Sequence, residues 1–221
     1  MIETIVLSVF SLLHDGFEFV DSDQMIVGVD EAGCGPAFGE LVASAVVLPD
    51  NPTIEGLADS KKLTPKKRGL LYAQLTNPDS GCVIGVGRIS NVEIDARGLA
   101  WARRAVFHRA LDNLEENGLP SSAIHKIIVD GTIFESWKGV AHECVVKADA
   151  KIPCVSAASI IAKVTRDDSI VQMCEQFPEL KAYYKLDKNK GYLTRDHIEG
   201  IKAHGLTNWH RKSYAIKGYN A

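Results

Sequence analysis

Two adjacent acids stand at the end of a short apolar run near residue 30. Residues 25–29 are Met-Ile-Val-Gly-Val, and Asp30 and Glu31 follow them directly. Such a run is typical of a buried strand, and carboxylates at its end are unfavourable unless a cation stabilises them. The Gly-Cys-Gly segment at residues 33–35 allows the backbone to approach a ligand closely. The pattern favours a metal and phosphate site, although a plain turn before Pro36 also fits.

A second acid stands at the end of another predicted strand. Residues 124–129 indicate a strand that runs into Asp130. If this strand lies parallel to residues 25–29, both carboxyl ends emerge at one edge of the sheet, where such sheets bind ligands. We therefore expect Asp130 beside Asp30.

A third acid lies on a helix predicted from Ser156 to about Gln176. Asp167 falls on the same stripe as the apolar residues of this helix, which are Ile160, Val164, Val171 and Cys174. Acids on core-facing stripes are rare, so we expect Asp167 to face inward. An ion pair with Lys163, four residues earlier, is the alternative.

Together these residues predict a four-carboxylate cluster of Asp30, Glu31, Asp130 and Asp167. Four carboxylates in one cleft repel each other and take up protons unless cations neutralise them. Oxygen ligands suit Mg²⁺ or Mn²⁺. Residues 181–217 carry nine Lys or Arg against three acids. A basic surface beside a metal site favours phosphodiester hydrolysis by metal-activated water, although solvated helix faces could also explain the charges.

Alternating strands and helices must position these acids. Besides the two strands above, we expect strands at 41–48 and 82–89, and helices at 64–75, 90–118 and 194–203. The first three strands can form an antiparallel meander, whereas the fourth requires a helical crossover. The predicted fold class is therefore α/β, with a mixed β-sheet flanked by helices.

Composition and charge restrict the class of protein further. The 221 residues are 46% apolar, which suits one globular domain with an appendage. Residues 1–60 hold 11 acids and no Lys or Arg, and the rest holds 17 acids and 25 bases. Five cysteines without a Cys-x-x-Cys motif argue against a zinc site and for a reducing, cytoplasmic location. Residues 1–24 start with an apolar run too short to span a membrane, and we expect this extension to pack on a catalytic domain at 25–221.

Six ordered motifs resemble those of the type II ribonuclease H (ribonuclease HII) family. They are Val29-Asp-Glu-Ala-Gly-Cys-Gly-Pro36, Asp59-Ser-Lys-Lys-Leu63, Val129-Asp-Gly131, the run from Ser156 to Asp167, Lys190-Gly-Tyr-Leu-Thr194 with His197, and His210-Arg-Lys-Ser-Tyr214. The resemblance implies an RNase H-like fold with a C-terminal helical substrate-binding portion. It implies cleavage of the RNA strand of RNA–DNA hybrids and nicking on the 5′ side of a ribonucleotide in duplex DNA, with 3′-hydroxyl and 5′-phosphate products.

The resemblance also implies roles for individual residues. It places the family's catalytic, metal-binding acids on Asp30, Glu31, Asp130 and Asp167, and the reading of the ribose 2′-hydroxyl on Gly33, Cys34 and Gly35. The other implied substrate contacts are Ser60, Lys61, Tyr192, Arg211 and Lys212. A core tyrosine and a solvated lysine are the alternatives at Tyr192 and Lys61. The expected partners are RNA–DNA hybrid and ribonucleotide-containing duplex DNA, bound by a monomer without membrane association.

One departure from the family pattern is Cys34, where the family carries an arginine. A thiol cannot replace the contact of a guanidinium with phosphate, so we expect an active enzyme with weaker substrate binding. A hybrid-binding module without catalysis is the non-enzymatic alternative, and the presence of all four acids argues against it. A metal phosphatase and a proofreading exonuclease are further alternatives, but their Asp-x-Asp and Asp-x-Glu spacings do not occur at residues 30–31.

Overall fold

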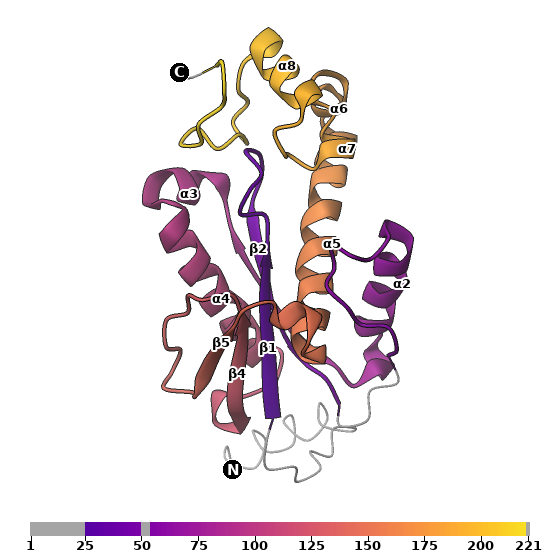
Figure 1. The fold of residues 1–221 in the computed structure, drawn as a ribbon, viewed down its shortest axis with the longest axis vertical. Helices are drawn as coiled ribbons and strands as arrows, with labels where there is room; N and C mark the ends of the chain where they lie inside the picture. Colours follow the sequence, from indigo (N-terminus) through magenta and orange to yellow (C-terminus); the bar gives the residue numbers. More distant parts are fainter. Residues whose placement is uncertain (1–24, 50–53, 220–221) are drawn as a thin grey trace, which may run out of the picture.

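Five strands form one mixed sheet in the computed structural model, which describes residues 25–49 and 54–219 (Figure 1). The strands are β1 (Met25–Ala32), β2 (Leu41–Val47), β3 (Val83–Ile89), β4 (Ile124–Asp130) and β5 (His142–Val145), in the order β3-β2-β1-β4-β5. As predicted, β1, β2 and β3 form an antiparallel meander, and β4 lies parallel to β1. The carboxyl ends of β1 and β4 therefore point the same way.

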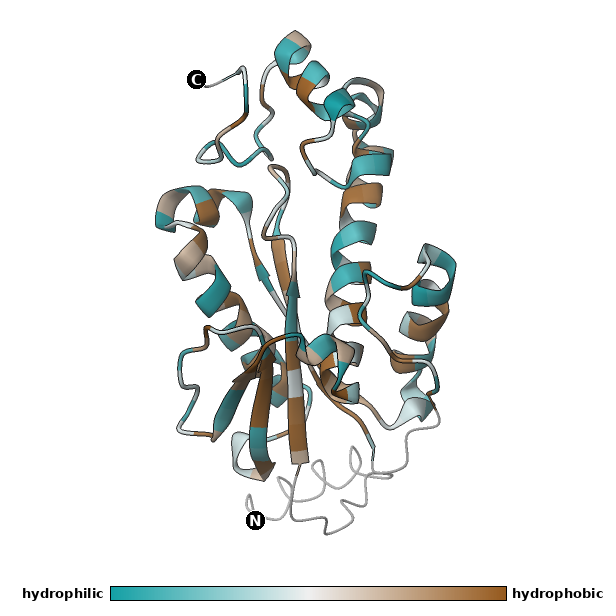
Figure 2. Ribbon diagram, viewed as in Figure 1, coloured by the Kyte–Doolittle hydropathy of each residue, from teal (hydrophilic) through white to brown (hydrophobic). Residues whose placement is uncertain are grey.

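Helices cover both faces of this sheet. They are α2 (Pro65–Leu75), α3 (Asn91–Arg97), α4 (Leu99–Glu116), α5 (Pro153–Gln176), α6 (Pro178–Tyr184), α7 (Leu186–Asn189) and α8 (Arg195–His204), with short 3₁₀ turns η1 (Pro78–Ser80), η2 (Ser121–Ala123) and η3 (Ala148–Ala150). Val27 and Val29 pack with α4 on one face, whereas Val46 packs with α2 and α5 on the other. Figure 2 shows the apolar residues of the strands between these helices. Two apolar layers thus enclose the sheet and fix the height of α5 beside β1.

Glycines allow the helices to approach the strands closely. A Cβ on Gly28 of β1 would lie 2.3 Å from the backbone of Cys154, and one on Gly87 of β3 would lie 2.3 Å from the carbonyl oxygen of Val106. Cβ atoms in proteins essentially never lie closer than 3.0 Å to such a neighbouring atom. The first turn of α5 therefore rests directly on β1, which carries Asp30.

A second apolar cluster joins the C-terminal helices to the rest of the molecule. Ile170 of α5 packs with Leu180, Leu186 and Ile201 from α6, α7 and α8. Phe38, from the loop after β1, lies in the same cluster and is fully buried. The C-terminal helices are therefore attached to the loop that carries the Gly-Cys-Gly segment.

Most predicted elements are confirmed, with a few differences. Thr64 caps α2, and Ser90 forms a capping box with Glu93 at the start of α3. The long helix predicted at 90–118 is wrong, because Gly98 adopts φ +81° and divides it into α3 and α4. The short elements β5, α6 and α7 were not predicted. The extension predicted at 1–24 lies outside the described residues, and none of the described helices combines the length and apolar composition of a membrane span.

Candidate metal centre and substrate site

Three carboxylates from three elements converge at one edge of the sheet. Asp30 lies in β1, Asp130 ends β4, and Asp149 lies in η3 after β5. One oxygen of each lies within 4.8 Å of the others. The backbone N–H of Ala148 donates to Oδ1 of Asp130 at 2.8 Å. Opposite ligands of a Mg²⁺ ion with bonds of about 2.1 Å lie about 4 Å apart, so small side-chain rotations would let all three oxygens bind one cation.

Two of the three carboxylates, those of Asp30 and Asp149, are held out of solvent, which disfavours their charged forms. Asp30 is 5% exposed. Burial raises the pKa of Asp30 to about 8, against a hydrogen bond from Ser159, and the charges of Glu31 and Asp130 raise it further. Burial and the charge of Asp130 also raise the pKa of Asp149. A divalent cation would relieve this strain, so the donor set fits such an ion.

Lys61 lies beside these carboxylates. Its backbone N–H donates to Oδ1 of Asp59 at 2.9 Å. Partial burial lowers the pKa of Lys61, but the charges of Asp30, Asp59 and Asp149 outweigh this effect and leave the pKa raised. The side chain is exposed next to the acid group, and its predicted contact with a substrate phosphate stays a prediction.

Ser60, the neighbouring predicted contact, has internal partners. It is 2% exposed, and its hydroxyl oxygen lies at hydrogen-bond distance, 2.9 Å, from that of Ser159 in α5. Its carbonyl oxygen accepts a hydrogen bond from Arg68 of α2. Ser60 therefore ties the turn that carries Lys61 to both helices.

Glu31 faces α4, because adjacent residues of a strand point to opposite faces. Arg103 of α4 donates to Oε1 of Glu31 from Nε (3.1 Å) and Nη2 (2.9 Å). The Cys34 thiol donates to the same oxygen at 3.4 Å. Burial, followed by the charge of Glu31, raises the pKa of Cys34 to about 12, so this thiol is not a nucleophile at neutral pH. Arg103 thus brings a guanidinium next to Cys34, although it comes from a different element.

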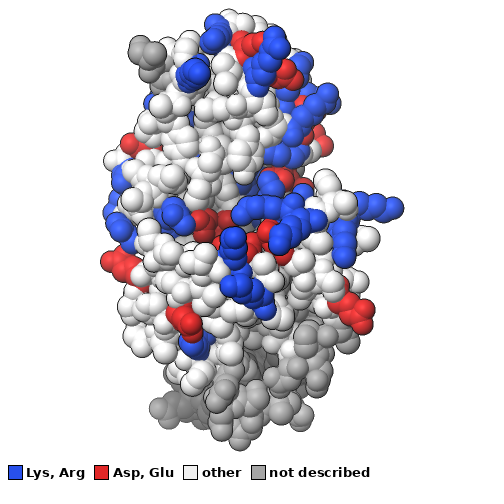
Figure 3. Space-filling view, viewed as in Figure 1, with Lys and Arg blue, Asp and Glu red and all other residues white. Residues whose placement is uncertain are grey.

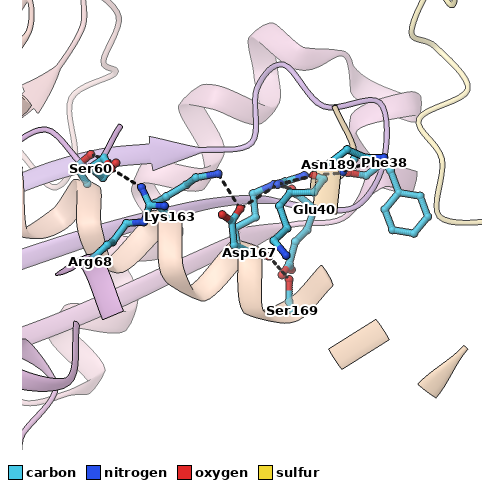
Figure 4. Close-up of polar contacts among 12 residues, drawn as sticks. Phe38, Glu40, Ser60, Arg68, Lys163, Asp167, Ser169 and Asn189 are labelled. Atoms are coloured by element: carbon cyan, nitrogen blue, oxygen red, sulfur yellow. Dashed lines mark hydrogen bonds and ion pairs between the residues drawn. The ribbon is translucent and has the colours of Figure 1, made fainter. Parts of the chain in front are cut away.

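Asp167 lies apart from the three converging carboxylates, contrary to the prediction. It follows Ser159, the α5 residue that hydrogen-bonds Asp30, by eight residues, which is about 12 Å along a helix. Its side chain is 17% exposed and accepts a hydrogen bond from Lys163 at 2.7 Å (Figure 4). The buried residue at this level of α5 is Arg166. The ion-pair alternative is therefore confirmed.

Two fully buried arginines hold the loop 33–40 after β1. Their guanidinium groups donate to backbone carbonyls: Arg166 to those of Phe38, Glu40 and Lys190, and Arg211 to those of Cys34, Gly39 and Glu40. The predicted duplex contact of Arg211 is therefore wrong, because burial keeps this side chain from a bound strand. Lys212, the next residue, is exposed, and its predicted contact stays a prediction.

Tyr192 lies at the surface beside the Gly-Cys-Gly segment. Tyr192 is 44% exposed, which excludes the alternative that it is a core tyrosine. A Cβ on Gly35 would lie 3.4 Å from the ring. Tyr192 also lines an open pocket of about 690 Å³ between α2 and α5, together with the basic residues Arg68, Lys163, Lys188 and Lys190. Figure 3 shows Lys and Arg side chains surrounding acids in the middle of this face.

Sequence reasoning did not identify Asp149 or Arg103. Asp149 lies between β5 and α5, in a segment without the apolar periodicity that would predict which way it faces. The signal that could have identified Asp149 is its place four residues before Pro153, where the chain leaves the sheet and α5 begins. Arg103 is one of several charged residues on α4, and only the packing of α4 on β1 selects it.

The fold and the acid group define the class of RNase H-like, metal-dependent nucleases. The solved ribonuclease H2 from Pyrococcus horikoshii OT3 is similar to this chain with a TM-score of 0.65 and 29% identity, over 86% of this chain and 94% of that one. The ribonuclease HII in a complex with PCNA from Archaeoglobus fulgidus shares the fold, with a TM-score of 0.68 and 24% identity, over 87% of this chain and 96% of that one.

Sequence comparison identifies the family. The family model "Ribonuclease HII" matches residues 27–217. Ribonuclease HII of Francisella tularensis subsp. novicida is 41% identical over 191 residues, which are 86% of this chain and 96% of that protein. The chain therefore belongs to the ribonuclease HII family, and it is a hydrolytic nuclease with RNase H activity on RNA–DNA hybrids.

Proposed function

We propose that this enzyme also nicks duplex DNA on the 5′ side of a single embedded ribonucleotide. In this reaction the oxygen of water bonds to phosphorus and the bond from phosphorus to the upstream 3′ oxygen breaks. The 3′ oxygen takes up a proton, so the products are a 3′-hydroxyl and a 5′-phosphate. The observation that supports this proposal is the juxtaposition of the three acids Asp30, Asp130 and Asp149 with Lys61.

Mg²⁺ or Mn²⁺ would be held by Asp30, Asp130 and Asp149, with Glu31 as a further proposed ligand beside Asp30. Such ions activate water and stabilise charge on the leaving oxygen. Lys61 would bind the phosphate beside them. Asp167 is not proposed as a ligand, since its carboxylate pairs with Lys163.

The ribose 2′-hydroxyl would be read by backbone groups of Gly33, Cys34 and Gly35, which the buried arginines hold in place. Tyr192 would pack on the adjacent sugar, and Lys212 with the basic pocket between α2 and α5 would bind backbone phosphates. This arrangement needs no arginine at residue 34, and it supports retained activity despite Cys34. We further propose that the enzyme acts as a monomer in the cytoplasm.

The test is cleavage of a duplex that carries one ribonucleotide, with Mg²⁺ or Mn²⁺ in parallel. We expect nicking on the 5′ side of the ribonucleotide, and at least about a 100-fold lower rate for Asp130→Asn with duplex binding retained. A parent protein that cuts long hybrids but leaves this duplex intact would refute the proposal. Binding without cleavage of either substrate would favour a hybrid-binding module instead.

A further inference from the structure

Two histidines that are distant in sequence meet inside the C-terminal part of the molecule. His197 lies in α8, and His210 lies in the segment after it; both are 0% exposed. Their Nε2 atoms are 3.0 Å apart. Nothing in the reaction proposed above uses this pair, although a buried pair of imidazoles requires a defined set of donors and acceptors.

The hydrogen bonds around the pair fix the position of each proton. The backbone N–H of Thr207 donates to Nδ1 of His210 at 2.9 Å, so this nitrogen is an acceptor. A neutral imidazole carries one N–H, which in His210 must be on Nε2 and point to Nε2 of His197. His197 then carries its proton on Nδ1 and donates to the backbone carbonyl of Tyr192 at 3.0 Å. The result is a chain of donors that runs from Thr207 through both histidines to Tyr192.

The surroundings keep both rings neutral and fixed. Burial lowers the pKa of His197, and burial followed by the charge of the partner lowers the pKa of His210 to about 3. The ring of Phe38 packs edge-on against His210 at 5.0 Å, and Tyr184 packs at 5.2 Å. Since all four ring nitrogens have a hydrogen-bond partner, the pair has no free lone pair for a metal ion.

The hydrogen bonds from the histidines end at Tyr192, whose backbone carbonyl is hydrogen-bonded and whose side chain is exposed. The carbonyl of Tyr192 also accepts a hydrogen bond from the N–H of Thr194 at 2.8 Å, and the preceding carbonyl, of Gly191, accepts one from Ala37 at 3.0 Å. The Tyr192 ring, by contrast, is exposed beside Gly35. Its location therefore depends on a backbone that is held from inside.

We propose that His197 and His210 are positioning residues, which orient Tyr192 toward the substrate through this hydrogen-bond chain. The inference rests on the proposed substrate contact of Tyr192. Displacing this ring would shift the bound strand relative to the acid group, and small shifts of reacting atoms reduce rates strongly. The pair is thus part of the machinery for substrate recognition, although neither ring touches the substrate.

The test combines His210→Gln with Tyr192→Ala in a double-mutant cycle. Glutamine cannot accept from Thr207 and donate to His197 in the same geometry. We expect His210→Gln to lower kcat/KM on the single-ribonucleotide duplex about 10-fold when Tyr192 is present, and less than about 2-fold when Tyr192 has been replaced by alanine. The matched control is His204→Gln. His204 stacks on Tyr183 at the surface and takes no part in the hydrogen bonds that link Thr207 to Tyr192.

Equal losses in both backgrounds would overturn the proposal, because they would indicate general destabilisation. Should His210→Gln fail to fold, His197→Asn and His197→Ala replace it. Asparagine retains an N–H donor near the position of Nδ1, so we expect it to keep more activity than alanine, and equal activities would refute the role. If Tyr192→Ala alone has no effect, the inference fails together with that contact, whereas nicking by the parent protein still supports the proposed function.

Discussion

At the scale of single residues, the sequence indicates the proximity of only two of the three acids in the acid group. Asp30 and Asp130 could be placed together because each lies near the carboxyl end of a strand, and parallel neighbours align those ends. Asp149 could not, because it lies in a turn whose direction depends on the packing of η3 against α5. Asp167 was misplaced because a helical stripe indicates a face of the helix but not the height at which that face meets the sheet.

Replacing two acids separately distinguishes the two arrangements. We expect Asp149→Asn to lower kcat at least about 100-fold, because it removes one of three converging oxygens. Asp167→Asn should change kcat less than about 3-fold, because it removes only a partly exposed pair with Lys163. Steady-state cleavage of an RNA–DNA hybrid measures both. A larger loss of kcat for Asp167→Asn than for Asp149→Asn would show instead that Asp167 belongs to the metal site.

At the scale of elements, capping residues and apolar runs in the sequence predicted the helix starts and the strands that they determine locally. The caps at Thr64 and Ser90 and the apolar runs of four strands are all confirmed. The break at Gly98 was not predicted, although its cause is local, because this glycine adopts φ +81° and a Cβ there would meet nothing within 4 Å. The short helices α6 and α7 were not predicted either. The burial of Arg211 was not predicted because it follows from the carbonyls of the loop 33–40 and not from its basic neighbours.

The contact of α5 with β1 gives a prediction about stability. Gly28→Ala should lower the free energy of unfolding by about 1–3 kcal/mol, because the added Cβ would lie 2.3 Å from the backbone of Cys154. The control is Gly69→Ala in α2, where a Cβ meets nothing within 4 Å and should raise the free energy of unfolding by about 0.5–1 kcal/mol. Urea unfolding measures both changes. A Gly28→Ala protein as stable as the parent would show that α5 does not rest on β1 as closely as described.

At the scale of the whole molecule, buried polar side chains join the sheet to the C-terminal helices. Arg166 and Arg211 hold the loop 33–40, and His210 forms an isolated bridge with Phe38 of that loop. Asp30 and Asp130 lie on the sheet and Asp149 lies in η3, whereas Tyr192 and Lys212 belong to the C-terminal part. The relative placement of the two parts therefore sets the distance between the proposed substrate contacts and the acid group.

The buried histidines make this junction sensitive to acid. An unfolded chain holds His210 at a pKa near 6.5, and the folded protein lowers it to about 3. Between these values the unfolded state binds more protons, so the contribution of His210 is complete above pH 6.5 and is lost as the pH falls toward 3. Lowering the pH from 7 to 5 should therefore reduce the stability of the parent by about 1–2 kcal/mol more than that of His210→Gln. Urea unfolding of both proteins at each pH measures the difference, and the comparison cancels the titration of the groups they share. A difference between the two proteins that is the same at pH 7 and pH 5 would show that His210 does not carry this sensitivity.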